Sequence, residues 1–178
     1  MTLEAPVPQA RRVLGVIMDQ ALRATGSADL RRFSELAGER LAMECGAPGS
    51  WAFFAGVDVT ATEVTCCVAG AHRVHLIKGD SIVESTREHT LANDPGALSQ
   101  LATDVRRRHA NMVVRSLGAG GHSPAELTRW SIEGPCDIVV VSADYYHYRE
   151  PLTYALAVKD ALAASEPIQG SCAWLSRH

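Results

Sequence analysis

The segment between Trp51 and Ser85 constrains the fold more than any other part of the sequence, because it holds four short runs rich in β-branched and aromatic residues. Turn residues separate the runs, and Lys78-Gly79-Asp80-Ser81 reads as a hairpin turn. Short runs divided in this way are typical of antiparallel strands. The predicted strands are Trp51–Val59, Glu63–Ala69, His72–Ile77 and Ile82–Ser85.

Helical patterns precede and follow this block. Apolar residues recur at helical spacing over residues 10–45, with a break at Gly26-Ser27, which predicts two helices. Two further helices are expected over residues 96–108 and 151–164. Later strands are expected at Trp130–Glu133, Ile138–Ser142 and Ser171–Leu175, the second of them central because it is apolar throughout. Helices followed by strands with inserted helices predict an α+β fold.

Length and charge narrow the class of protein. The 178 residues suit one domain, with residues 1–9 as an N-terminal tail and residues 10–178 as the domain. The net charge is −3, so the sequence lacks the excess of basic residues that is typical of nucleic-acid-binding proteins. No apolar run is long enough to cross a membrane. We therefore expect a cytoplasmic protein. The five cysteines form no Cys-x-x-Cys pair and are expected to be reduced and buried.

Four segments between residues 50 and 150 stand out by their order and spacing: Val68–Leu76, Thr86–Leu91, Asn111–Gly118 and Ile138–Asp144. Together they resemble the metal-dependent protein phosphatase type 2C (PPM) family. The first resembles a family strand that contains Gly-Asp-Ser-Arg, and Gly70, Arg73 and Leu76 fall on matching positions. The resemblance implies an antiparallel β-sandwich flanked by helices, here truncated and lacking the N-terminal strands of the family.

The resemblance also implies a site for two metal ions, held by carboxylates between the two sheets. The family aspartates correspond to Ala71 and Ala143 in this chain, and a later Asp-Asn pair corresponds to Gly170 and Ser171. Asp144 lies one position beyond Ala143, and a shift of one residue along a strand turns a side chain to the opposite face. We therefore expect no bound metal, no cofactor and no ordinary metal-dependent phosphatase activity.

The degenerate site still carries titratable and aromatic residues. The candidates for catalysis are His75, Asp144, Tyr145 and His147, and those for ligand binding are Arg73, His72 and Tyr146. Alternation along a strand places Arg73 and His75 on the face of position 71 and His72 on the opposite face. We expect the face of Arg73 and His75 to line the former metal cleft.

Three functional interpretations remain open from the sequence. The favoured one is a pseudophosphatase domain that acts as a regulatory, ligand-binding or partner-binding module. The alternative is a metal-independent enzyme that uses His, Asp and Tyr for acid–base chemistry on a small molecule. The third is that these side chains only pack and hydrogen-bond. Because a truncated sandwich exposes a sheet edge, a homodimer or a protein partner that covers it is expected.

Overall fold

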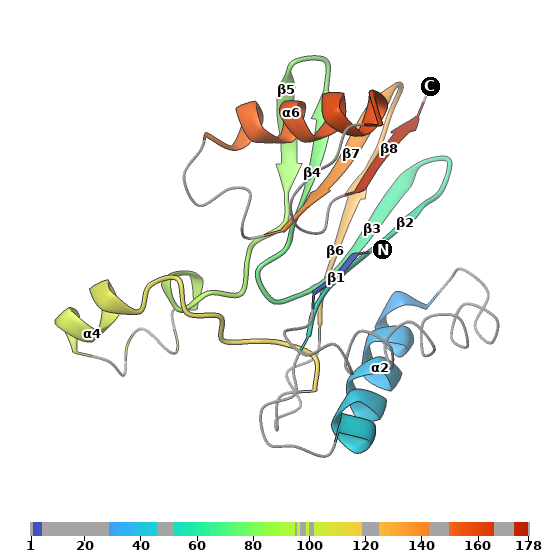
Figure 1. Cartoon of the computed structure of the whole chain (residues 1–178). Coiled ribbons are helices and arrows are strands. Elements are labelled where there is room, and N and C mark those ends of the chain that lie inside the picture. The colour runs from blue at the N-terminus through green and yellow to red at the C-terminus, as the bar shows by residue number, and fades with distance from the viewer. Residues whose placement is uncertain are drawn as a thin grey trace.

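Two antiparallel sheets form the body of the chain in a computed structural model (Figure 1). The structure describes residues 2–4, 29–45, 52–94, 96, 99, 102–118, 125–142, 150–165 and 173–177. The first sheet has the strand order β1-β2-β3-β6, with bounds Thr2–Glu4, Phe53–Val59, Glu63–Ala69 and Glu126–Ser131. The second sheet has the order β5-β4-β7-β8, with bounds Ser81–Ser85, Arg73–Lys78, Cys136–Val141 and Ala173–Arg177.

Each sheet carries a helix on its outer face. Helix α2 (Leu30–Cys45) packs Phe33 and Leu41 against Phe54 of β2, and the rings of Phe33 and Phe54 stack 5.5 Å apart. Helix α6 (Pro151–Ala163) lies across the second sheet, where Tyr154 and Val158 pack on β7 (Figure 1). The Glu150 side chain caps α6 by accepting the Thr153 N–H, and Pro151 at the first position needs no such partner. The remaining helical elements are the 3₁₀ turn η2 (Leu91–Asn93) and the short helix α4 (Thr103–Arg108).

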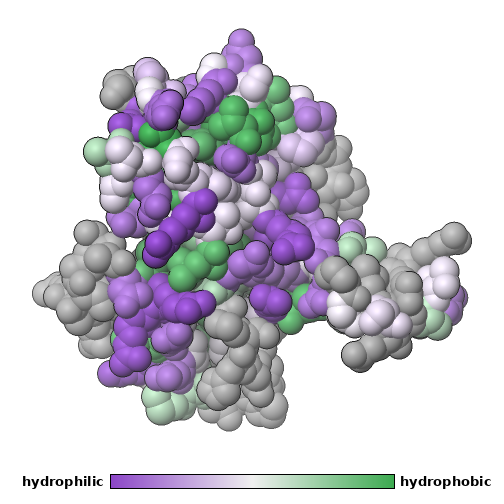
Figure 2. All heavy atoms as spheres, turned by 180° about the vertical axis from the view of Figure 1, so that it is seen from behind, coloured by the Kyte–Doolittle hydropathy of each residue, from purple (hydrophilic) through white to green (hydrophobic). Residues whose placement is uncertain are grey.

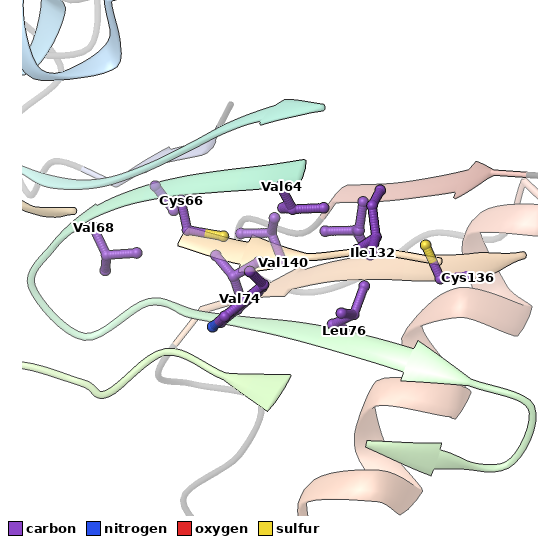
Figure 3. Close-up of a cluster of buried hydrophobic side chains, with 11 residues drawn as sticks. Val64, Cys66, Val68, Val74, Leu76, Ile132, Cys136 and Val140 are labelled. Atoms are coloured by element: carbon purple, nitrogen blue, oxygen red, sulfur yellow. The ribbon is translucent and has the colours of Figure 1, made fainter. Parts of the chain in front are cut away.

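The main core lies between the two sheets (Figure 3). Val74 and Leu76 of β4 face Val64, Cys66 and Val68 of β3 across it. Alternation turns the next residue, Cys67, to the other side of the first sheet, against α2. Burial raises the pKa of the Cys66 thiol to about 12 and that of Cys67 to about 11, which keeps both thiols protonated at neutral pH.

Most predicted elements are present. The helix predicted around Leu30–Leu41, the strands between residues 51 and 85, the central position of β7 and the last helix are confirmed. The earlier helix predicted within residues 10–25 lies outside the described residues. Thr2–Glu4, expected in an N-terminal tail, forms β1 and pairs with Phe53–Ala55.

Two predicted boundaries are wrong. The strand predicted at Trp130–Glu133 instead spans Glu126–Ser131, because its ladder with β3 extends from the Val68–Glu126 pair to the Glu63–Ser131 pair. The single helix predicted over residues 96–108 is interrupted at Ala102, which has extended backbone angles. Helix α4 starts only after it, with Asp104 in the first turn, where a carboxylate favours a helix start.

The surface of the described residues has no single large apolar region. The exposed large hydrophobic side chains come from different elements, and the view from behind shows hydrophobic groups separated by hydrophilic ones (Figure 2). They are Met43, Val83, Met112 and Leu175. In the described part of the chain, no helix is both long and apolar enough to cross a bilayer. The expected homodimer or partner on a sheet edge stays a prediction; β5 and β8 are the outer strands of the second sheet.

The turn from β3 to β4, which carries the chain from the first sheet to the second, requires glycine at position 70. Gly70 has φ +103°, and a β-carbon there would lie 2.3 Å from Cδ1 of Phe53. Any side chain at this position would strain the backbone and would also clash with the Phe53 ring.

We predict that Gly70→Ala lowers the free energy of unfolding by at least about 2 kcal/mol. Gly134→Ala is the matched control, because Gly134 has φ +70° but no atom within 4 Å of the added carbon, so only strain of about 1 kcal/mol applies. Urea unfolding of both variants measures the difference. Equal losses would show that Phe53 moves aside without cost.

Candidate functional site

The end of the sandwich near the β3–β4 turn is where the resemblance implies a metal site. The β4–β7 ladder finishes there with the Arg73–Val141 pair, and the next residues along the two strands, just beyond the ladder, are His72 and Ser142. His72 also meets Phe53 of the first sheet edge-on, with ring centroids 6.3 Å apart. His72 therefore lies between the two sheets, on the same face of the second sheet as Val74 and Val140.

His72 and Ser142 are both fully buried. The Nδ1 and Nε2 atoms of His72 and the Oγ of Ser142 have no hydrogen-bond partner among the described residues. Burial lowers the pKa of His72 to about 4, because the charged imidazolium would lose its hydration. At neutral pH this end of the sandwich therefore presents a neutral imidazole and a hydroxyl.

Arg73 and His75 face the opposite way. The Nε2 of His75 lies 2.7 Å from the Tyr154 hydroxyl of α6, and its Nδ1 lies 2.7 Å from Oγ of Ser85 on β5. Arg73 forms an ion pair with Glu88 and a hydrogen bond to Tyr154. The expectation that Arg73 and His75 face the space between the sheets is wrong, because the inward positions of β4 are taken by the alternating residues Val74 and Leu76.

The direction of the hydrogen bonds around His75 follows from the donors. An arginine side chain can only donate, so the Tyr154 oxygen accepts from Arg73 and its single proton goes to Nε2 of His75. The proton of His75 then lies on Nδ1 and is donated to Ser85. Burial, with Arg73 nearby, lowers the pKa of His75 to about 4, and burial raises the pKa of Tyr154 to about 12. Both ring nitrogens of His75 are thus engaged in a neutral network under α6.

A second histidine, His89, ties the β3–β4 turn to β6. Its Nδ1 accepts the Gly70 N–H at 3.2 Å, so its proton lies on Nε2 and is donated to Glu126 at 2.9 Å. Desolvation lowers the pKa of His89 despite the nearby carboxylate. The sequence analysis gave His89 no role, although it stands in one of the four matching segments, Thr86–Leu91.

A half-open pocket of about 80 Å³ adjoins His89. It is lined by Arg87, Glu88, His89, Thr90, Asn93, Asp94, Val114, Arg115 and Glu126. Both charge signs are present, and the nearest charged atoms of Arg87 and Glu126 are 3.6 Å apart. The pocket therefore has no dominant charge.

The remaining candidates lie outside the described residues. These are Asp144, Tyr145, Tyr146 and His147. Convergence of the four catalytic candidates on one pocket stays a prediction, since only His75 is described.

The described side chains at this end of the sandwich do not fit a pair of hard divalent cations. Such cations take several oxygen ligands, chiefly carboxylates. Ala71 supplies a methyl group, and His72 and Ser142 supply a neutral imidazole and a hydroxyl. Within the described ranges, no group of three or more His, Cys, Asp or Glu side chains is arranged to hold a metal.

We predict that Tyr154→Phe lowers the free energy of unfolding by about 1–2 kcal/mol, because buried His75 and half-buried Arg73 each lose one hydrogen bond. Ser85→Ala is the control at the other nitrogen of His75. Ser85 is exposed, so water replaces its hydroxyl and the loss is smaller. Chemical denaturation of the two variants gives the comparison. A larger loss for Ser85→Ala would contradict the proposed order of donors.

Stability is expected to fall as the pH drops from about 6.5 towards 4. His72 and His75 have a pKa of about 4 in the folded chain and about 6.5 when unfolded, so in this window the unfolded chain binds more protons. Each contributes a loss of about 1.4 kcal/mol per pH unit. Urea unfolding at several pH values measures the slope, and His72→Gln removes the contribution of His72 while those of the other buried histidines remain. A slope that His72→Gln leaves unchanged would refute the assignment to His72.

No protein-family profile matches the chain. No curated protein matches it either. Solved structures do match it.

The PPM Ser-Thr phosphatase MsPP from Mycobacterium smegmatis, in complex with cacodylate, has a TM-score of 0.61 and 13% identity, over 98% of this chain and 84% of that one. The serine/threonine phosphatase Stp1 from Staphylococcus aureus has a TM-score of 0.62 and 12% identity, over 93% of this chain and 75% of Stp1. The Mycobacterium tuberculosis phosphatase PstP/Ppp has a TM-score of 0.57 and 13% identity, over 98% of this chain and 84% of PstP/Ppp. The chain has the fold of the PPM serine/threonine phosphatases.

Proposed function

We propose that this chain is a pseudophosphatase domain that uses the phosphatase fold as a regulatory, ligand-binding or partner-binding module. The observation that supports it is the content of the space between the sheets. Neutral, buried His72 and Ser142 stand at the end of β4 and β7, next to the positions that the resemblance assigns to aspartates. A neutral imidazole and a hydroxyl, the polar groups described there, suit binding without hydrolysis.

Metal-dependent phosphoryl transfer requires charge that these residues do not supply. Two metal ions clamp a phosphate and generate the attacking hydroxide, and carboxylates must neutralise the ions. The structure of the PstP catalytic domain, which this chain matches at 12% identity, is a complex with two manganese ions. Ala71 and Ala143 have no ligand atom in their side chains, and a single neutral imidazole cannot replace a set of carboxylates.

The position of Arg73 also argues against phosphate binding between the sheets. Arginine is the residue that most often binds phosphate through two parallel hydrogen bonds. Here the guanidinium is held on the α6 side of the second sheet by Glu88 and Tyr154. Acid–base catalysis by His75 gains no support either, since both of its ring nitrogens are bonded within the network under α6.

We predict that the purified chain shows no turnover of p-nitrophenyl phosphate above the metal blank in the presence of Mn²⁺ or Mg²⁺. Calorimetric titration with either ion should show no tight two-site binding. An active PPM phosphatase run in parallel provides the positive control. Tight binding of two ions together with metal-dependent turnover would overturn the proposal, because it would mean that other residues have rebuilt the metal site.

A further inference from the structure

Three polar atoms at the end of the sandwich stand out by their lack of partners. They are Nδ1 and Nε2 of His72 and Oγ of Ser142, on side chains that are 0% exposed. The two residues directly follow the Arg73–Val141 pair, which is the last pair of the β4–β7 ladder. The neighbouring inward positions on their strands are Val74 and Val140, which are apolar (Figure 3).

Buried polar atoms are almost always hydrogen-bonded, because the loss of their hydration is otherwise uncompensated. The other two buried histidines in the described residues follow this rule. His75 bonds Tyr154 and Ser85, and His89 bonds Gly70 and Glu126. His72 differs from both, because neither of its nitrogens has a hydrogen-bond partner among these residues, and the same holds for the hydroxyl of Ser142 at the end of the neighbouring strand. One bound group that forms hydrogen bonds with both His72 and Ser142 would satisfy all three atoms.

The surroundings decide the charge of that partner. Glu88 is the single Asp, Glu, Lys or Arg among the buried residues that the structure describes, and it pairs with Arg73. Burial keeps His72 neutral at pH 7. Among the described residues, no unpaired buried charge would compensate for the lost hydration of an ion placed between His72 and Ser142, and an uncompensated ion there is strongly unfavourable. A neutral group avoids this penalty.

We propose that this end of the sandwich binds a small neutral group that carries both a hydrogen-bond donor and an acceptor, such as a carboxamide, between His72 and Ser142. This inference rests on the proposed binding role and names the ligand class for it. A neutral imidazole offers one donor and one acceptor, and a hydroxyl offers both. A carboxamide presents an N–H₂ donor and a C=O acceptor side by side, which matches them.

Three probes of the same shape and different charge test the inference: acetamide, acetate and acetamidinium. Each is titrated to about 100 mM into the full chain at pH 7 and constant ionic strength, because four heavy atoms limit the attainable affinity. The readout is the ¹⁵N chemical shift of the His72 ring nitrogens. Acetamide should shift them saturably, and the two ions should not. His109, which is exposed, serves as the reference histidine in the same spectra.

Ser142→Ala should weaken acetamide binding about fivefold or more, the effect of one lost hydrogen bond. Ser131→Ala, on an exposed position of β6, is the matched control and should leave the binding unchanged. Both variants remove only a hydroxyl, and circular dichroism checks that they fold.

Two results would overturn the inference. Saturable shifts with acetate or acetamidinium equal to those with acetamide would show that the site does not select a neutral group. No shift with any probe, together with His72 nitrogens already hydrogen-bonded in the free chain, would show that an internal water or another side chain of the chain is the partner. Neither result bears on the phosphatase assay and metal titration, so failure of this inference is separable from failure of the proposed function.

Discussion

The alternation of side chains along β4 decides what this domain presents on each side of its second sheet. Val74 and Leu76 point inward and hold the two sheets together, so Arg73 and His75 must point outward to α6. The same alternation brings His72, two residues before Val74, into the space between the sheets. A shift of one residue in this strand would exchange the two sets, placing an arginine in the core and valine under α6. The packing of the core therefore fixes the register of β4. This register in turn determines which polar side chains point into the end of the sandwich.

The three buried histidines show how position changes the role of one residue type. Desolvation lowers the pKa of all three. His75 and His89 compensate for burial with hydrogen bonds at both nitrogens, and each bridges separate segments: β4 to α6 and β5, and the β3–β4 turn to β6. These bonds give His75 and His89 a structural role, because they hold separate segments of the fold together. His72 has no hydrogen-bond partner among the described residues, and this contrast makes it the centre of the candidate site.

The fold of this chain and the chemistry of a site on that fold depend on different residues. A TM-score near 0.6 over more than 90% of the chain shows the architecture of PPM phosphatases, at an identity of only 12–13%. Such architecture depends on apolar residues in alternation, which many sequences satisfy. The metal chemistry depends instead on individual carboxylates, and a single change from aspartate to alanine removes a ligand without disturbing the core. The architecture by itself therefore does not say which chemistry the domain performs.

The sequence by itself determined the order of helices and strands, the central place of the apolar strand at residues 138–141, the opposite directions of Cys66 and Cys67, and the alanines at the expected aspartate positions. These follow from local periodicity and residue identity. Only the tertiary structure decided which face of β4 meets the other sheet, because both faces carry apolar and polar residues and the choice depends on what packs against each. The partners of His75, the bridging role of His89 and the isolation of His72 depend on Tyr154, Glu126 and Phe53, which lie far from them in the sequence. Contacts across such distances are set by the packing of the whole domain, and no local pattern encodes them.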